Sequence, residues 1–103
     1  MKNTYKRAAT AALVAWSLGL SAAHADELTV GVQLPMTGTL ARVGSGMQEG
    51  IMVAAEVFNK ANGKHKIKLI TVDDESAPAK AIAAVEKLAS QGALAITGGY
   101  GSN

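Results

Sequence analysis

An alternation of strand-like and helix-like segments is the feature of this sequence that most restricts its fold. Residues 28–34 (LTVGVQL), 66–72 and 93–97 are short, largely apolar and bounded by turn-forming residues, as buried strands are. Between them, residues 46–61 and the stretch from Ser76 to Gln91 repeat apolar residues every three to four positions, which indicates helices. Two successive strand–helix–strand units require parallel strands joined by right-handed crossovers. The sequence therefore predicts an α/β fold with a parallel, doubly wound sheet in the order β-α-β-α-β.

Local signals predict where the two helices begin and end. Ser45 and Gln48 have the spacing of a capping box at the start of the first helix, and Asn62-Gly63 ends it. The apolar residues expected on its buried face are Met47, Ile51, Ala54 and Phe58.

The second helix has its own start and stop signals. Ser76 is the expected cap, Pro78 lies in the first turn where a missing N–H costs nothing, and Gly92 ends the helix. The residues expected to form its buried stripe are Ile82, Val85, Leu88 and Ala89.

The first 25 residues have the organisation of a secretory signal peptide. Lys2, Lys6 and Arg7 precede an apolar segment over residues 8–20, and the small residues of Ala23-His24-Ala25 follow. The apolar segment is shorter than the roughly 20 residues that a membrane-spanning helix needs. We therefore expect export, with cleavage before Asp26, although an uncleaved membrane anchor is the alternative.

Charge and cysteine content restrict the function of the remaining residues, 26–103. They contain seven Lys and Arg against eight Asp and Glu, a formal charge of −1, because three of the ten basic residues lie in the signal segment. No basic surface is left to bind nucleic acid. The sequence has no cysteine, so neither disulfide bonds nor a lipid-modified N-terminal cysteine is available to this exported chain. A periplasmic or secreted bacterial protein is the expected class.

The loops that follow the three strands are the expected binding region. In doubly wound sheets, ligands bind beyond the carboxyl ends of the strands, and the loops after Leu34, Val72 and Thr97 all lie there. The last of them, GGYGSN, has small residues that let a ligand approach the backbone, and its consecutive N–H groups are suited to an anion. An ordinary turn in which Ser102 or Asn103 caps a following helix is the alternative.

Two other kinds of site are less well supported. Gly44-Ser45-Gly46 lies about ten residues beyond the first strand, whereas a dinucleotide fingerprint follows its strand directly. The acidic run Asp73-Asp74-Glu75 could bind a hard cation, but acidic residues before a helix are also favoured by the helix dipole. One histidine outside the signal segment, His65, makes no triad or metal cage by itself. We expect no catalytic residue, no metal and no cofactor.

Three separated blocks of this sequence resemble the start of a known family. They are LTVGVQLPMTGTLARVGSGMQEGIMVAAEVFN with its P-[LM]-[TS]-G loop, IKLITVDDESAPAKAIAAVEKLASQG with its D-D-x-x-x-P-x-x-A segment, and AITGGYGSN. In this order and spacing they are similar to the branched-chain amino acid (leucine/isoleucine/valine) type of periplasmic solute-binding proteins, the receptor subunits of ABC importers. The resemblance covers residues 28–103.

The resemblance implies a type I periplasmic-binding fold, in which two α/β lobes joined by a hinge close on a small solute. The serine of the loop after the third strand binds the ligand carboxylate in the family, and Ser102 has that place, with Gly101 beside it and Tyr100 as a wall of the pocket. The loop after the first strand contributes a contact, often aromatic, at the position of Val43. This aliphatic residue departs from a standard leucine-like pocket and leaves room for another carboxylate, an amide or an aromatic acid. The implied partner is an ABC permease in the inner membrane.

The resemblance also implies that residues 26–103 are the first part of the first lobe of a longer protein. Two other functions stay open on the sequence alone. A periplasmic sensing domain would have the same fold and signal to a membrane partner. An exported α/β enzyme would use Asp73 or Asp74 and would lose turnover when both are replaced by Asn.

Overall fold

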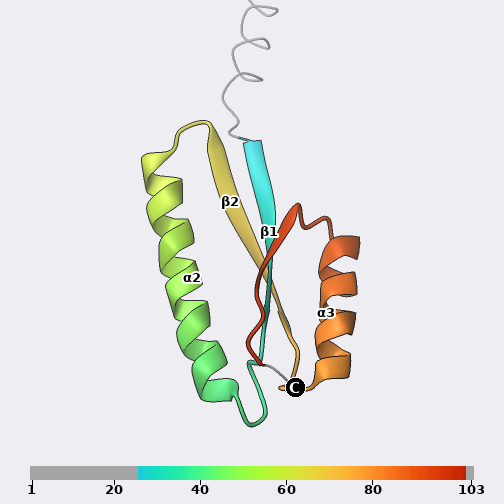
Figure 1. Cartoon of the computed structure of the whole chain (residues 1–103). Helices are drawn as coiled ribbons and strands as arrows, with labels where there is room; N and C mark the ends of the chain where they lie inside the picture. Colours follow the sequence, from blue (N-terminus) through green and yellow to red (C-terminus); the bar gives the residue numbers. More distant parts are fainter. Residues whose placement is uncertain (1–25, 102–103) are drawn as a thin grey trace, which may run out of the picture.

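Five elements follow one another in the predicted order (Figure 1). They are strand β1 (Asp26–Leu34), helix α2 (Ala41–Ala61), strand β2 (His65–Asp73), helix α3 (Pro78–Ser90) and strand β3 (Ala95–Gly98). The computed structural model describes residues 26–101 of the chain. The three strands are parallel, and β1 lies between β2 and β3. The predicted parallel α/β architecture is confirmed.

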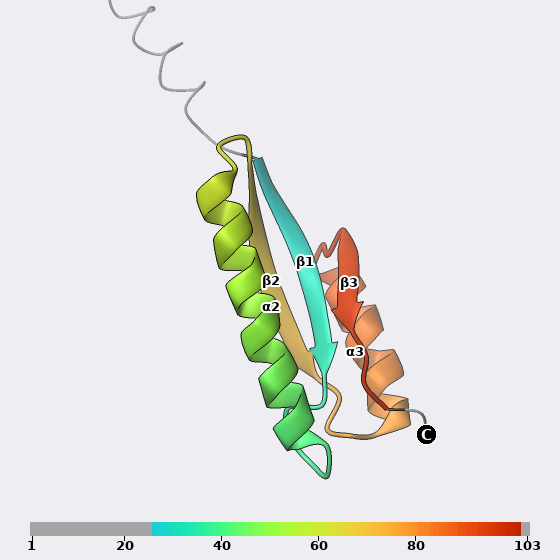
Figure 2. The same cartoon turned by 60° about the vertical axis from the view of Figure 1, so that its left-hand side comes forward.

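Strand β1 pairs with its two neighbours over different lengths. All of it pairs with β2, from Asp26 opposite His65 to Leu34 opposite Asp73. Only its second half pairs with β3, over residues 30–33. Because parallel strands point the same way, the chain leaves all three at one edge of the sheet (Figure 2). The loops expected to share this carboxyl edge do so.

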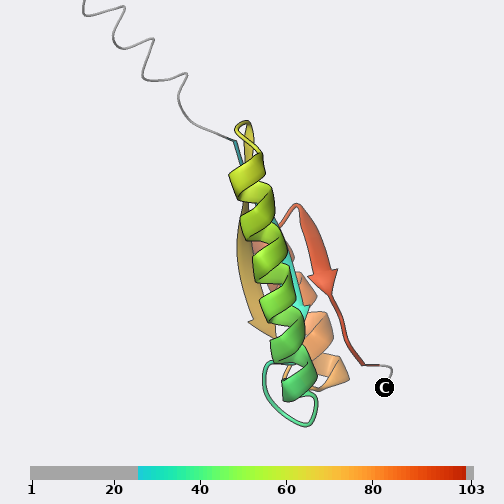
Figure 3. The same ribbon diagram turned by 90° about the vertical axis from the view of Figure 1, so that its left-hand side faces the viewer.

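The two helices cover opposite faces of the sheet (Figures 1 and 3). The chain moves from β1 outward to β2 and then crosses back over β1 to β3. Right-handed crossovers in opposite directions place their helices on opposite faces, which makes the sheet doubly wound. Neither helix within residues 26–101 is both long and apolar enough to cross a bilayer.

Helix α2 begins at Ala41, five residues before the predicted start at Gly46. The added turn contains Gly44, and Gly46 follows it, but a helix tolerates single glycines at a cost of about 1 kcal/mol each. Gly44 is required by packing, since a Cβ at this position would lie 1.9 Å from the carbonyl oxygen of Pro35. The first turn of α2 therefore lies directly against the loop that leaves β1.

The predicted capping box at Ser45 and Gln48 is wrong. Both residues lie inside the helix, whose N-cap is Leu40, and no side chain caps that end. The Gln48 amide instead donates a hydrogen bond to the hydroxyl of Thr71 on β2, with an N–O distance of 3.0 Å. Gln48 therefore lies on the helix face that packs over the sheet, and its side chain bonds to β2 instead of capping the helix.

The core is small and centres on the end of β1. Val32, Leu34 and Leu88 are fully buried, and the small residues Ala55 and Ala84 bring the two helices close to the sheet. Leu88 lies over Gly31, where a Cβ would be only 3.1 Å from the Leu88 Cδ1 atom. The missing side chain of Gly31 therefore makes room for the fully buried Leu88 of α3.

Part of the predicted buried faces is wrong. On α2, Ala55 is buried and Ala54 is exposed. On α3, Leu88 is buried as predicted, but Ile82 and Val85 are 67% and 40% exposed and Ala89 is exposed, while Ala84 is buried. Both helices are apolar around much of their circumference, so periodicity alone does not select the side that faces the sheet. The alanines are buried because their small side chains let each helix approach the sheet closely.

Candidate functional site

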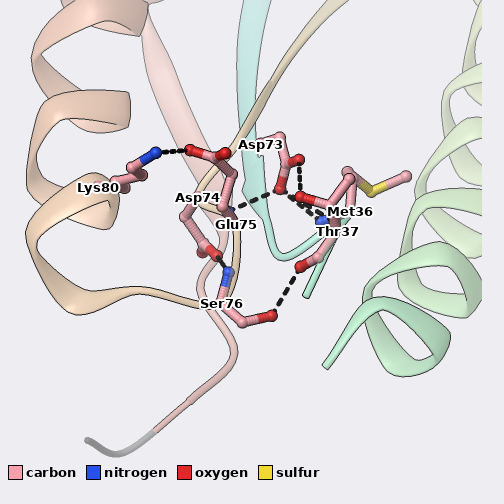
Figure 4. A network of polar contacts seen from close by, with 7 residues as sticks. All are labelled: Met36, Thr37, Asp73, Asp74, Glu75, Ser76 and Lys80. Carbon is pink, nitrogen blue, oxygen red and sulfur yellow. Dashed lines mark hydrogen bonds and ion pairs between the residues drawn. The ribbon is translucent and has the colours of Figure 1, made fainter. Parts of the chain in front are cut away.

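Three loops lie together at the carboxyl edge of the sheet: residues 35–40 after β1, 74–77 after β2 and 99–101 after β3. Figure 4 shows the contacts between the first two. The third returns along the end of β1, where the Gly99 N–H donates to the carbonyl oxygen of Gln33 at 2.8 Å. All three loops are thus fixed to strand ends.

Asp73, the last residue of β2, holds the loop after β1 (Figure 4). Its Oδ1 atom accepts hydrogen bonds from the backbone N–H groups of Met36 at 2.8 Å, Thr37 at 3.2 Å and Glu75 at 2.8 Å. Its Oδ2 atom accepts a further bond from the Thr37 hydroxyl at 2.6 Å. A single carboxylate therefore fixes the loops after β1 and β2 to each other.

These contacts change the acidity of Asp73. Removal from water would raise the pKa of the carboxyl group, but the hydrogen bonds from the Thr37 hydroxyl and from three backbone N–H groups favour the charged form. The combined effect of these hydrogen bonds is larger than the effect of burial, so the pKa of Asp73 is lowered below its ordinary value. Asp73 is consequently ionised at neutral pH and is a hydrogen-bond acceptor only.

Ser76 makes a second bridge between the same loops and does not cap the following helix. Helix α3 has Ala77 as its N-cap, with no side-chain cap, and Pro78 in its first turn as predicted. The Ser76 hydroxyl donates to the carbonyl oxygen of Thr37 at 2.7 Å and accepts from the Leu40 N–H at 3.1 Å. The predicted cap is wrong because a longer-range partner uses the hydroxyl.

The three acidic residues of this loop have three separate environments. The Asp74 side chain is buried, and its Oδ1 accepts from the Ser76 N–H at 2.9 Å. Glu75 is exposed and forms an ion pair with Lys80. Within residues 26–101, no three His, Asp or Glu side chains are grouped so that they could hold a metal ion. Asp73 and Asp74 organise the loops by hydrogen bonds. This differs from the helix-dipole role expected from the sequence, since no acidic residue lies in the first turn of α3.

A pocket of about 390 Å³ lies between the third loop and the first turns of α3. Its polar lining comes from Gln33, Asp74, Ser76 and Tyr100, and the rest from the backbone of Gly99 and Gly101 and from apolar side chains of Leu40 and α3. Asp74 is the one charged residue among the described residues that line it. The pocket therefore combines apolar walls with a few polar groups, as small-molecule sites do.

The site residues predicted from the sequence are distributed as follows. Tyr100 and Gly101 line the pocket, and the Tyr100 side chain is 47% exposed. Val43 is exposed in the first turn of α2 and does not line the pocket. Ser102 lies outside the described residues. Their roles in ligand binding stay predictions.

The glycines of the third loop are required by its backbone. Gly98, Gly99 and Gly101 have φ angles of +104°, +75° and +133°, which side chains disfavour. At Gly98 a Cβ would also lie 2.2 Å from the carbonyl oxygen of Gln33. The loop therefore bends tightly against the end of β1 and presents its backbone to the pocket.

Gln33 is a pocket residue that the sequence prediction misses. It lies inside the apolar run of β1 between the fully buried Val32 and Leu34, and it is itself only 9% exposed. Its amide donates to the Oδ2 atom of Asp74. A single polar residue in a buried strand is a signal that could have indicated a paired polar group, because buried amides are hydrogen-bonded.

The periplasmic binding protein family matches residues 27–103, which include every described element except the first residue of β1. The chain belongs to this family. The match covers both crossovers and the three loops at the carboxyl edge. The residues that form the described fold are therefore the same ones that match the family.

Curated periplasmic binding protein relatives extend well beyond the matched region. An amino acid binding protein of Pseudomonas aeruginosa is 33% identical over 105 residues, which cover 99% of this chain and 28% of the relative. A Leu/Ile/Val-binding protein homolog 3 of Brucella melitensis is 36% identical over 80 residues, 76% of this chain and 22% of the relative. Leu/Ile/Val-binding protein BraC3 of Rhizobium johnstonii is 33% identical over 91 residues, which cover 86% of this chain and 24% of the relative. The chain thus spans about a quarter of the length of these relatives, all of which are named as binding proteins.

Proposed function

We propose that residues 26–103 are the first part of the first lobe of a two-lobed receptor that captures amino acids or related small carboxylates for an ABC importer. Family membership and the names of the relatives support the class of protein. The observation that carries the proposal is the pocket at the carboxyl edge, which is lined by the backbone of Gly99 and Gly101. This is the edge at which doubly wound sheets bind ligands.

In this proposal the loop after β3 binds the acidic end of the solute. The backbone of the loop is exposed at Gly101. The Gly99 N–H is already bonded to the carbonyl oxygen of Gln33, so the N–H groups proposed to bind the anion are those that follow Gly99. The Ser102 hydroxyl and these N–H groups donate to the ligand carboxylate, and the ring of Tyr100 forms one wall. Val43, which does not line this pocket, contributes an aliphatic contact where the solute extends toward the first turn of α2. The protein binds and releases its solute without chemical change.

The proposed location is the periplasm, after removal of residues 1–25. Strand β1 begins at Asp26, so cleavage before Asp26 leaves all five described elements intact. Sequencing the N-terminus of the exported protein should give Asp-Glu-Leu. A first residue upstream of Ala23 would contradict this part of the proposal.

Calorimetric titration of the complete receptor with leucine, isoleucine and valine tests the function. Replacing Ser102 by Ala should weaken binding by about tenfold or more, because a hydrogen bond to a charged ligand is lost. Ser90→Ala is the matched control, since the Ser90 hydroxyl donates within α3 to the carbonyl oxygen of Lys87. A wild-type receptor that binds no amino acid or small carboxylate, or unchanged binding by Ser102→Ala, would contradict the proposal.

The importer partner needs a separate experiment. Deletion of the gene should abolish high-affinity uptake of the solute by intact cells, and the wild-type gene should restore it. Unchanged uptake, together with the loss of a transcriptional or chemotactic response to the same solute, would instead support the sensing function.

A further inference from the structure

Gln33 is the least expected residue at the proposed site, because it is a polar side chain near the end of the central, buried strand. Its neighbours Val32 and Leu34 are fully buried, and Gln33 itself is 9% exposed. It lines the pocket together with Asp74 and residues of α3. Placing an amide in such a position is costly unless its polar atoms have partners.

The chemistry of Asp74 fixes the orientation of this amide. A carboxylate accepts hydrogen bonds only, so the Gln33 group that faces Asp74 Oδ2 must be the donor, Nε2, at 2.5 Å. The carbonyl oxygen Oε1 then points the other way, toward the third loop, and lies 3.6 Å from the place of a Cβ on Gly99.

The Oε1 atom has no donor among residues 26–101, since the only side-chain hydrogen bond of Gln33 there is the one from Nε2. At the same time, no completely enclosed polar side-chain atom in this part of the chain lacks a partner. Oε1 is therefore accessible from the pocket. Among residues 26–101, this nine-tenths buried residue thus presents an acceptor without a donor to the space where the solute is proposed to bind.

The surrounding charge strengthens this acceptor. The hydrogen bond to the Asp74 carboxylate pushes electron density of the amide toward Oε1, and hydrogen bonds in a poorly hydrated site reinforce one another in this way. No Lys, Arg or His is among the described residues that line the pocket. This end of the pocket is therefore suited to an N–H donor, and most of all to a protonated amine.

We infer that Gln33 is a specificity-determining residue, whose Oε1 atom accepts a hydrogen bond from the amino group of the bound solute. The inference rests on the proposed function and adds that the solute is an α-amino acid rather than a simple carboxylate. Geometry supports it, because Gln33 holds the third loop through its backbone oxygen and the Gly99 N–H. An amino group on the same carbon as the bound carboxylate lies beside this loop. Asp74 is the positioning residue that orients the Gln33 amide.

The test compares amino acids with analogues that lack only the amine. The complete receptor is titrated with leucine and with 4-methylpentanoate, and with valine and 3-methylbutanoate. Gln33→Met keeps the length of the side chain and removes the acceptor. We expect this variant to bind the amino acids about tenfold more weakly and to bind the two simple carboxylates unchanged. Gln48→Met is the matched control, because Gln48 contacts Thr71 outside the pocket, and it should alter neither pair.

A purely structural role for Gln33 predicts a different pattern. In that case Gln33→Met lowers the melting temperature and weakens the amino acids and the simple carboxylates by the same factor, and this result overturns the inference, as does unchanged binding of all four. If the single variant does not fold, Gln33→Met combined with Asp74→Asn removes the buried carboxylate that has lost its partner, and the same comparison is made. A wild-type receptor that binds none of the four overturns both proposals, whereas wild-type binding with no selective loss in the variants overturns only this one.

Discussion

Asp73 holds Thr37 at two points: Oδ2 accepts from its hydroxyl at 2.6 Å and Oδ1 accepts from its N–H at 3.2 Å. The two residues are 36 positions apart in sequence: Asp73 is the last residue of β2, and Thr37 lies in the loop after the neighbouring parallel strand β1. Their contact fixes the loop after β1, which leads into the first turn of α2. The geometry of the proposed binding edge thus depends on a side chain that does not line the pocket.

Replacing Asp73 by Ala should therefore destabilise the folded protein. Three backbone N–H groups and one hydroxyl lose their acceptor, and water replaces it only in part because the residue is half-buried. We expect a loss of about 1–3 kcal/mol in the free energy of unfolding. Urea denaturation measures it. Glu75→Ala is the matched control, because this exposed carboxylate makes an ion pair with Lys80 and should contribute less than about 0.5 kcal/mol. Equal losses in the two variants would show that the loop contact is unimportant.

The lowered pKa of Asp73 predicts how this contribution depends on pH. The carboxyl group is more acidic in the folded chain than in the unfolded chain, so its ionised form stabilises the fold. The contribution is complete above about pH 5 and decreases as the pH falls below about 4, through the folded-state value. The stability difference between wild type and Asp73→Asn should therefore become smaller between pH 5 and pH 2. A difference that stays constant over this range would mean that the charge of Asp73 makes no contribution.

Gly44 and Gly50 both lie within α2 and should respond to Ala in opposite directions. A Cβ on Gly44 would lie 1.9 Å from the Pro35 carbonyl oxygen, so Gly44→Ala must move the loop or the helix and should cost about 1–3 kcal/mol. Nothing lies within 4 Å of a Cβ on Gly50, so Gly50→Ala should stabilise the helix by about 0.5–1 kcal/mol. Thermal melts of the two variants provide the comparison. A stabilised Gly44→Ala variant would contradict the close packing of Pro35 on α2.

The order of elements along the chain, the parallel strands and the binding edge could be predicted from the sequence because they depend on topology. Short apolar runs alternating with helical periodicity allow few arrangements, and parallel strands bring the loops after Leu34, Asp73 and Gly98 to one edge whatever their side chains are. The glycine-rich loop at residues 98–101 was predictable for a similar reason, since its positive φ angles require residues without a Cβ.

The side-chain contacts between elements could not be predicted in the same way. Ser76 and Gln48 have the sequence spacing of helix caps, yet each bonds to a residue more than 20 positions away. Local signals describe local partners, and a polar side chain takes a distant partner when packing brings one closer. The burial of Ala84 in place of Val85 has a similar origin, because the approach of α3 to the sheet is a tertiary property. Gln33 was missed because its partner Asp74 is 41 residues away.

Residues 26–103 should not form a stable domain when they are produced alone. The buried apolar side chains are few, and large apolar side chains such as Met52, Ile82 and Leu94 are more than half exposed. Within residues 26–101, strands β2 and β3 each have one unpaired edge, and exposed edges of a sheet favour association. We expect the purified segment to bind the dye ANS, to aggregate at micromolar concentration and to lose its circular dichroism gradually on heating. A sharp, cooperative thermal transition of a monomer would contradict this prediction and would show that the small core around Val32, Leu34 and Leu88 is sufficient for folding.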